Sequence, residues 1–269
     1  MDNISDIQRK NASRRVKILS YNVHSCVGTD RKVDPGRIAE VIAAAEPDII
    51  GLQEVDVGRK RTGGIDQAQV IASLLQMDSH FYPALHLAEE KYGDAMLTAF
   101  PVKPIKAGPL PSLGEQRGAI WTEIDVGGIG LHVINTHLGL RPRERALQVE
   151  ALLGGEWLGN PLCQAGERIL MGDFNAIPTS SVYRTVGRAL QDAQMQPGQR
   201  PRATFPSRFP LLRLDHVFVS VGIRVVSTEV IRTPLARKAS DHLPLLVTLD
   251  LPLPAGISSE IAGSEMRSL

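Results

Sequence analysis

The chain has 269 residues, of which 43% are hydrophobic, and its 30 basic and 29 acidic side chains give a formal net charge of +1. This length suffices for one large domain with a full core. The balanced charge excludes a global field that would draw the protein to nucleic acid or to membranes. Two cysteines are too few for a disulfide framework, and the polar first residues lack the apolar segment of a signal peptide. We therefore expect a soluble, cytoplasmic protein.

Strand-like and helical stretches alternate in the first half of the chain. A helix is predicted to begin at Asp34-Pro35 and to be stopped by Pro47. Asp66 is expected to cap a second helix that runs through Met77. Strands are predicted at 17–24 and 48–55, and near 80–85, 95–100, 119–126 and 129–138.

The second half continues this alternation and predicts an α/β protein with buried sheets. A helix is expected from Pro142 to Leu158, with Arg145 and Gln148 on one face. Strands are predicted at 168–174, 214–220, 223–231 and 243–251. We expect a flexible N-terminus (1–15), a single domain (16–252) and a disordered C-terminal tail (253–269).

Polar side chains stand where the predicted strands end, which is where open sheets carry their chemistry. They lie in the stretches SYNVH, GLQEV, INTHL, GDFN, RLDHV and SDHLPL. The residues are Asn22, Glu54, His137, Asp173, Asn175, Asp215, Asp241 and His242. Because strand ends meet at one edge of a sheet, we expect these groups to form a single site.

The residue types in this set favour one kind of chemistry. Carboxylate and amide oxygens suit Mg²⁺ or Mn²⁺ better than Zn²⁺, whose sites favour Cys and His. A histidine beside a separate carboxylate is the pattern of a general base, since the carboxylate orients the ring and stabilises its charged form. The pattern predicts metal-assisted hydrolysis by an activated water.

Several of these stretches, taken in chain order, resemble the endonuclease/exonuclease/phosphatase superfamily, which has the deoxyribonuclease-I-like fold. They are YNVH, LQEV, YGDAML, RGAI, NTHLGL, GDFN, LDHVFVS and SDHLPL, and they span residues 17–249. GDFN followed by LDHVFVS and SDHLP is the most specific part. RTGGIDQA (61–68) is typical of a bacterial branch of metal-dependent hydrolases. The resemblance implies a four-layer α/β sandwich, two mixed β-sheets packed face to face with helices on the outside.

The resemblance also implies a role for each matching residue. Glu54 of LQE is the first expected ligand of Mg²⁺ or Mn²⁺, with Asn22 beside it and Asp241 as a further ligand candidate. Asp173 would orient or activate the attacking water. Asn175 would contact the phosphoryl oxygen, where a second carboxylate would repel the substrate.

Two histidines complete the implied machinery. His242 would be the general base or the group that stabilises the transition state, with Asp215 behind it. His137 would polarise the phosphate or protonate the leaving group. Nuclease members give this second histidine a carboxylate just after a tyrosine, so Asp94, which follows Tyr92-Gly93, is its expected partner.

Three further side chains are expected to bind substrate. Arg117 in QRGAI matches a position that often contacts phosphate, Arg61 belongs to a basic loop before two glycines, and Tyr92 precedes Asp94. A basic run is also typical of a solvated face. The chain has TAFP (98–101) where many relatives have Ser-Arg before Phe-Pro, so a role for that arginine does not apply here.

The sequence leaves the substrate open. A nuclease should carry a basic track, but the net charge of +1 and the aromatic content of 4% do not favour nucleic acid. The segment 197–213 alternates arginines with Phe205, Phe209 and two leucines. Such a segment can hold a phosphorylated headgroup at a membrane surface, or it can be a proline-rich loop that packs its phenylalanines on the sheet.

Three hypotheses follow from these observations. The first is a metal-dependent phosphoesterase that hydrolyses a phosphodiester of a small molecule or a phospholipid headgroup. The second is an endonuclease or exonuclease that uses the same chemistry on DNA or RNA. The third is a binding module on the same fold without catalysis, against which the complete set of acids, amides and histidines argues. The oligomeric state stays open.

Overall fold

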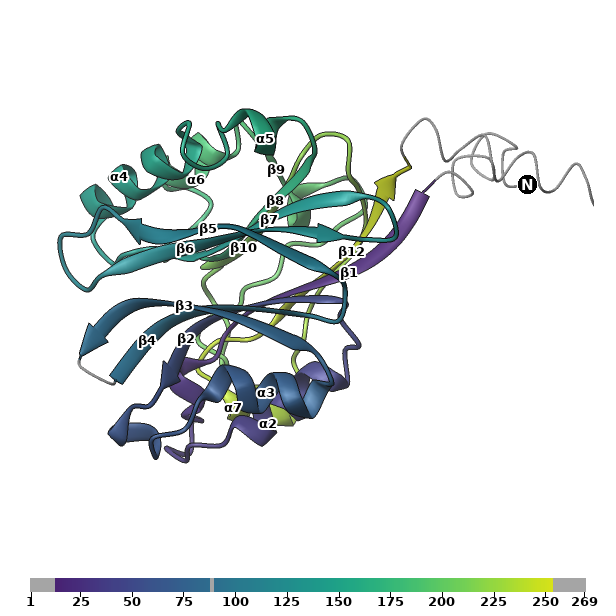
Figure 1. Cartoon of the computed structure of the whole chain (residues 1–269). Coiled ribbons are helices and arrows are strands. Elements are labelled where there is room, and N and C mark those ends of the chain that lie inside the picture. Colours follow the sequence, from purple (N-terminus) through teal and green to yellow (C-terminus); the bar gives the residue numbers. More distant parts are fainter. Residues whose placement is uncertain (1–12, 88–89, 254–269) are drawn as a thin grey trace, which may run out of the picture.

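The computed structural model describes residues 13–87 and 90–253, and its strands form two mixed six-stranded sheets (Figure 1). The first sheet has the strand order β11-β12-β1-β2-β4-β3. In chain order its strands are β1 (Ser13–Asn22), β2 (Ile49–Val57), β3 (Asp78–Leu87), β4 (Glu90–Thr98), β11 (Arg224–Val230) and β12 (Leu245–Pro252). Within these ranges β1 and β2 run parallel, and every other neighbouring pair is antiparallel.

The second sheet has the order β5-β6-β7-β8-β10-β9. Its strands are β5 (Val102–Leu110), β6 (Arg117–Asp125), β7 (Gly130–His137), β8 (Glu167–Asp173), β9 (Gln191–Asp192) and β10 (Asp215–Val219). It too contains one parallel pair among the described strands, β7 with β8. Each sheet therefore presents the carboxyl ends of two neighbouring parallel strands at one edge.

Helices cover the outer face of each sheet (Figure 1). The first sheet is covered by α2 (Pro35–Ala43), α3 (Gln67–Leu75) and α7 (Pro234–Ala239), and the second by α4 (Pro142–Leu153), α5 (Pro161–Gln164) and α6 (Ser181–Val186). Short 3-10 turns are η1 (His24–Cys26), η2 (Lys60–Thr62) and η3 (Ala193–Met195). The predicted four-layer sandwich is confirmed. In the described part of the chain, no helix is both long and apolar enough to cross a membrane.

The two sheets pack face to face through side chains that alternate along each strand. In β8, Ile169 and Met171 belong to the large cluster that lies between the sheets and beneath α2 and α3, whereas Leu170 faces the helices of the second sheet. Gly51 permits the sheets to come close, since a Cβ there would lie 2.6 Å from Cε of Met171. Beside it, Nε2 of Gln53 donates to Oδ1 of Asn135 at 2.7 Å and ties the sheets together.

Local signals set several of the helix boundaries. Asp34 and Asp66 accept hydrogen bonds from backbone N–H groups at the starts of α2 and α3, each at 2.9 Å, as predicted. Helix α3 ends at Leu75 rather than at Met77. Helix α4 ends at Leu153 rather than at Leu158, because Gly154 adopts an extended backbone and stops it.

Some elements differ from the prediction. β1 begins at Ser13, so residues 13–15 pair with β12, while residues 1–12 and 254–269 of the predicted termini lie outside the described residues. The sequence did not predict β5, whose Pro104 and Pro109 are tolerated because the strand lies at a sheet edge. It also did not predict α6 and α7, which span six residues each and are too short to show a helical period.

Candidate active site

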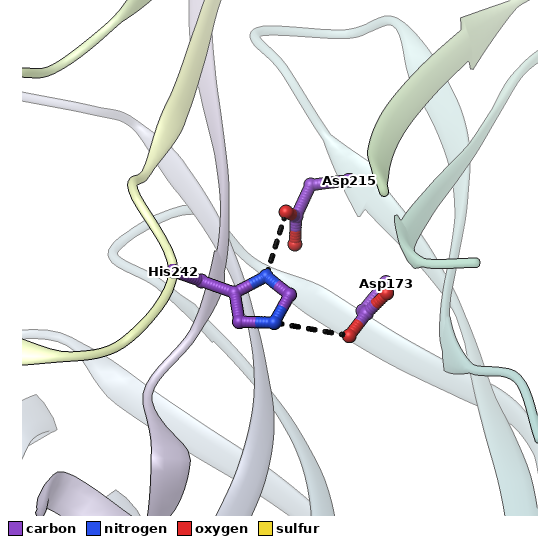
Figure 2. Close-up of side chains that lie close together, drawn as sticks. All are labelled: Asp173, Asp215 and His242. Atoms are coloured by element: carbon purple, nitrogen blue, oxygen red, sulfur yellow. Dashed lines mark hydrogen bonds and ion pairs between the residues drawn. The ribbon is translucent and has the colours of Figure 1, made fainter. Parts of the chain in front are cut away.

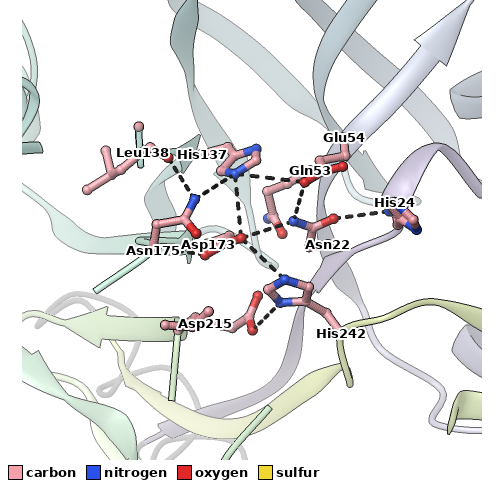
Figure 3. Close-up of polar contacts among 12 residues, drawn as sticks. Asn22, His24, Gln53, Glu54, His137, Leu138, Asp173, Asn175, Asp215 and His242 are labelled. Carbon is pink, nitrogen blue, oxygen red and sulfur yellow. Dashed lines mark hydrogen bonds and ion pairs between the residues drawn. The ribbon is translucent and has the colours of Figure 1, made fainter. Parts of the chain in front are cut away.

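A pocket of about 710 Å³ opens where the ends of β1, β2, β7 and β8 meet. Most residues predicted for the site lie around it or directly behind it, and Figure 3 shows the polar contacts among several of them. Those that line it are Glu54, Arg61, Tyr92, Arg117, His137, Asp173, Asn175, Asp241 and His242. Asn22, Asp94 and Asp215 lie behind this lining and are almost fully buried.

His242 forms a hydrogen-bonded pair with Asp215 at the base of the pocket (Figure 2). Nδ1 of His242 lies 2.8 Å from Oδ2 of Asp215, the first residue of β10. On the other side of the ring, Nε2 lies 3.6 Å from Oδ2 of Asp173. Asp215 is fully buried, and its Oδ1 has no hydrogen-bond partner among the described residues. The carboxylate thus orients the ring so that Nε2 faces Asp173.

The loop 204–214 holds this pair from behind. The ring of Phe205 packs against the ring of His242, with centroids 4.8 Å apart. On either side of His242, the backbone N–H of Leu243 donates to the carbonyl of Thr204 at 2.8 Å, and that of Ser207 donates to the carbonyl of Asp241 at 2.6 Å. This role of Phe205 is not evident from the sequence, because the contact joins residues far apart in the chain and no local motif marks it.

Asp173 and Asn175 are placed by the tight turn that ends β8. Oδ1 of Asp173 accepts from the backbone N–H of Asn175 at 2.8 Å. Asn175 has a φ of 47°, a left-handed conformation that asparagine tolerates better than most residues. Just before them, Gly172 has a φ of 142°, and a Cβ there would lie 1.8 Å from the carbonyl oxygen of Thr136. Glycine is therefore required where β8 passes β7.

Glu54 reaches the pocket because β2 contains a β-bulge. The register with β4 shifts between Leu52 and Val55, and Glu54 has a φ of 61°. Its Oε1 accepts from Nδ2 of Asn22 at 2.9 Å, and the same nitrogen lies 3.0 Å from Oδ2 of Asp173. Oδ1 of Asn22 accepts from the backbone N–H of His24. Asn22 therefore bridges Glu54 and Asp173 through its amide nitrogen (Figure 3).

His137 contacts different partners from those expected. Its Nδ1 lies 3.1 Å from Nη1 of Arg117, and its Nε2 lies 3.0 Å from Nδ2 of Asn175, which also donates to the carbonyl of Leu138. Nη1 of Arg117 and Nδ2 of Asn175 are both donors, so the neutral ring of His137 can accept a hydrogen bond from only one of them. Nε2 of His137 also lies 3.5 Å from Oδ2 of Asp173. The expected partner, Asp94, instead faces the backbone N–H of His137.

Burial and neighbouring charges separate the two histidines electrostatically. Burial lowers the pKa of His137 well below its usual value, and the nearby Arg117 and His242 lower it further. Burial also opposes the charge on His242, but Asp215 and Asp173 outweigh it and raise the pKa of His242 to about 10. Burial raises the pKa of Asp173 above the usual carboxyl range. These surroundings favour a neutral His137 and a charged His242.

Each of the three arginines on the wall of the pocket is paired with an acidic side chain. Arg61 binds both oxygens of the fully buried Asp56 at 2.8 Å, and its guanidinium lies 5.5 Å from the centre of the Tyr92 ring. Arg117 lies 3.2 Å from Glu115, and Nε of Arg59 lies 3.2 Å from Glu90. These acidic partners are not evident from the sequence, and they largely neutralise the positive charge of the arginines on the wall of the pocket.

The donor atoms around Asn22 fit a hard divalent cation. Oε1 of Glu54 and Oδ2 of Asp173 converge on the same amide nitrogen, and oxygen ligands are those that Mg²⁺ and Mn²⁺ prefer. Ligand atoms of Asp173, Asp215 and His242 also lie within 4.8 Å of one another. Of these, Asp215 and His242 already bind each other, which favours the Glu54 side. Asp241, the further candidate, lies 3.8 Å from Nδ1 of His24.

Comparison with known proteins bears on the family and the fold of the chain. The model of the Endonuclease/Exonuclease/phosphatase family matches residues 19–242. An uncharacterized protein of Escherichia coli K12, YbhP, is 27% identical over 250 residues, which cover 87% of this chain and 96% of YbhP. An endonuclease/exonuclease/phosphatase from Beutenbergia cavernae has a similar structure, with a TM-score of 0.72 and 24% identity over 89% of this chain and 72% of its own.

Two similar structures have more specific names. A mannosyl-6-phosphatase from Bacteroides thetaiotaomicron has a TM-score of 0.70 and 21% identity, over 87% of this chain and 99% of its own. The catalytic domain of human Nocturnin, solved with a bound sulfate, has a TM-score of 0.68 and 23% identity, over 87% of this chain and 93% of its own. At these identities the likeness extends to the fold alone.

Proposed function

Because the chain belongs to the Endonuclease/Exonuclease/phosphatase family, we propose that it is a divalent-metal-dependent hydrolase that cleaves a phosphodiester of a small molecule or a phospholipid headgroup with an activated water. One observation carries the proposal. The His242–Asp215 pair, Asp173 and Glu54 converge on a single pocket, and Asp173 lies within 3.6 Å of His242. A binding module has no need for a buried carboxylate that orients a histidine toward a second carboxylate.

Glu54 would hold Mg²⁺ or Mn²⁺, together with a further oxygen from Asn22 or Asp241. A bound cation at this place would supply Lewis acidity to a phosphoryl oxygen or to the attacking water. Asn22 would keep Glu54 and Asp173 in position, since its amide already contacts both carboxylates. Asn175 would donate to a phosphoryl oxygen without adding negative charge.

The charges in the pocket favour one of the two roles that the sequence leaves open for His242. A general base must be neutral before it accepts a proton, but Asp215 and Asp173 raise the pKa of His242. The charged ring is suited to stabilise the negative charge that develops on the phosphoryl group. Asp173 has a raised pKa and accepts the proton of the water more readily than an ordinary carboxylate.

His137 would act as a neutral donor. With Nδ1 accepting from Arg117, the ring would carry its proton on Nε2, which lies 3.5 Å from Asp173 and 3.9 Å from Glu54. Its lowered pKa makes a full positive charge costly, which supports polarisation of the phosphate over protonation of the leaving group. Asp94, fully desolvated beside Arg117, would help to fix that arginine.

The pocket supports a compact substrate. Its volume of about 710 Å³ lies within the usual range of small-ligand sites, roughly 300–1,000 Å³. The arginines on its wall are paired with Asp56, Glu90 and Glu115, which leaves little net positive charge along this wall to follow a nucleic-acid backbone.

A substrate panel with controlled metal tests the proposal. We expect release of alcohol from phospholipid or small-molecule phosphodiesters with Mg²⁺ or Mn²⁺, and no release with EDTA. Glu54→Gln should raise the metal concentration needed for half-maximal activity about tenfold or more, because it removes a charged ligand. Glu115→Gln is the matched control from the same pocket and should leave the metal requirement unchanged.

Two results of the panel would contradict the proposal. Hydrolysis of DNA or RNA alone, with a rate that falls steeply between low and moderate salt, would identify a nuclease. If no phosphate ester were turned over under any metal condition, the protein would be a binding module on this fold.

The pH dependence of kcat/KM separates the two roles of His242. Asp173 must lose its proton before it can accept one, so activity should rise at a pH above the ordinary aspartate value of about 3.9. His242 must keep its proton, so activity should fall as the pH passes about 10. Kinetics on a soluble chromogenic diester with Mg²⁺, from about pH 5 to about pH 10.5, would measure both limbs. Activity that still increases at about pH 10 would assign the base to His242 instead.

A further inference from the structure

The loop 204–214 extends from the back of the His242–Asp215 pair to an exposed apolar tip, formed by Phe209, Leu211 and Leu212. Phe205 and Leu212 close it with two backbone hydrogen bonds of 3.0 and 2.8 Å between their N–H and carbonyl groups. Between them, Phe209 is 77% exposed and Leu211 is 80% exposed. Leu212 is 41% exposed. Thus Phe205 packs on His242 at the pocket, and Phe209 does not pack on the sheet as the packed-loop alternative expects.

Four arginines surround the base of this tip. Arg237 donates to the carbonyl of Arg208 at 2.6 Å, Arg232 to that of Ala203 at 3.3 Å, and Arg208 to that of Thr29 at 3.2 Å. Burial and the charges of Arg202 and Arg237 lower the pKa of Arg232, which places these cations within electrostatic range of one another. Within the described residues, none of the four forms an ion pair with a carboxylate.

The tip lies beside the mouth of the pocket. Phe205, at its base, lines the pocket and packs on His242, and Ser207 binds the backbone next to that histidine. Leu140, also on the pocket lining, is 71% exposed. A surface that received Phe209 and Leu211 would therefore meet the opening of the pocket.

We propose that Phe209 and Leu211 insert into an anionic lipid surface while Arg202, Arg208, Arg232 and Arg237 face its headgroups. Cations without a carboxylate partner, next to exposed apolar side chains, are the pattern of interfacial binding. The tip carries too few side chains for a protein partner, since a stable interface needs about 800 Å² per side. Two of its three exposed apolar side chains are aliphatic, which suits acyl chains better than stacked bases.

This inference deepens the proposed function, because it implies that the scissile phosphodiester belongs to a membrane lipid. That implication rests on the proposed function. Binding can nevertheless be measured without turnover. The two proposals therefore fail independently, because vesicle binding tests the tip and hydrolysis of a soluble diester tests the site.

Cosedimentation with vesicles tests the inference. Wild-type protein should bind phosphatidylcholine vesicles that contain about 30% phosphatidylglycerol, and bind neutral phosphatidylcholine vesicles less. The double variant Phe209→Ser with Leu211→Ser should lose about tenfold or more in partition. It should keep its Tm and its rate on a soluble diester. Arg202→Gln should reduce binding most at low salt, because it removes one of the headgroup-facing charges.

The matched control is a double variant at two exposed apolar residues on other surfaces. Leu74 is 59% exposed on α3, and Val221 is 76% exposed after β10. Leu74→Ser with Val221→Ser should bind vesicles like wild type. Equal vesicle binding by wild type and the tip variant would overturn the inference. The inference would also be overturned if neither protein bound vesicles while the wild type bound single-stranded DNA, or self-associated, and the tip variant did not.

Discussion

Replacement of His242 by Ala, or of Asp173 by Asn, is expected to lower kcat by about 10²–10⁴-fold, and the double variant should be little worse than either single one. The two side chains lie 3.6 Å apart, and the charge on His242 lowers the pKa of Asp173, so each depends on the other. Groups that act as a unit give losses that do not multiply. Without His242, two buried carboxylates face each other with no cation between them, so Asp173 would hold its proton more tightly.

Single-turnover kinetics with saturating metal would measure these losses, and a thermal melt of each variant would show that the fold persists. His80, on β3 in the first sheet, offers the control, since His80→Ala should keep near-native kcat. If the losses of the two single variants multiplied in the double one, His242 and Asp173 would act independently. Near-native activity of His242→Ala would remove that residue from the chemistry altogether.

Gly172→Ala is expected to reduce the free energy of unfolding by about 3–5 kcal/mol, one of the largest effects of any single methyl in this chain. The backbone φ of 142° lies in a region that side chains rarely adopt, and the new Cβ would lie 1.8 Å from the carbonyl oxygen of Thr136. Both strands of the β7–β8 pair are central in the second sheet, so neither can move away freely. The same shift would displace Asp173, so activity should fall as well.

Urea denaturation at constant metal concentration would measure this cost. Gly64 is the matched control, because its φ is 73° but a Cβ there would meet nothing within 4 Å. Gly64→Ala should cost only about 1 kcal/mol, from the backbone conformation alone. An equal cost at both positions would show that the close approach to Thr136 contributes little.

The layered architecture could be predicted from the sequence because each signal for it is local. Strand patterns, the caps at Asp34 and Asp66, and the polar residues at strand ends all depend on neighbours in the chain. The order of the sheets then follows from the resemblance to a known family. For the same reason, the residues that the sequence grouped as a site do lie around or directly behind one pocket.

Features that depend on residues distant in the chain could not be predicted from local sequence patterns. The bulge that turns Glu54 inward is a property of the pairing between β2 and β4. The ring of His137 contacts Arg117 of β6 and Asn175 of the turn after β8, and both contacts join distant parts of the chain. Asp94 was predicted as the partner because it follows Tyr92 closely in the sequence. Likewise, Phe205 packs on His242 across more than thirty residues of intervening chain.

The residues of the proposed site are divided between the two sheets. Asn22 and Glu54 belong to the first sheet, whereas His137, Asp173 and Asp215 belong to the second. The two sheets meet through an apolar core and through the bond between Gln53 and Asn135 directly below the site. Neither sheet alone holds a complete set of reacting groups. If the contact between the two sheets loosened, turnover should therefore be lost before either sheet unfolds. Loss of turnover would then be the first measurable effect of such a change.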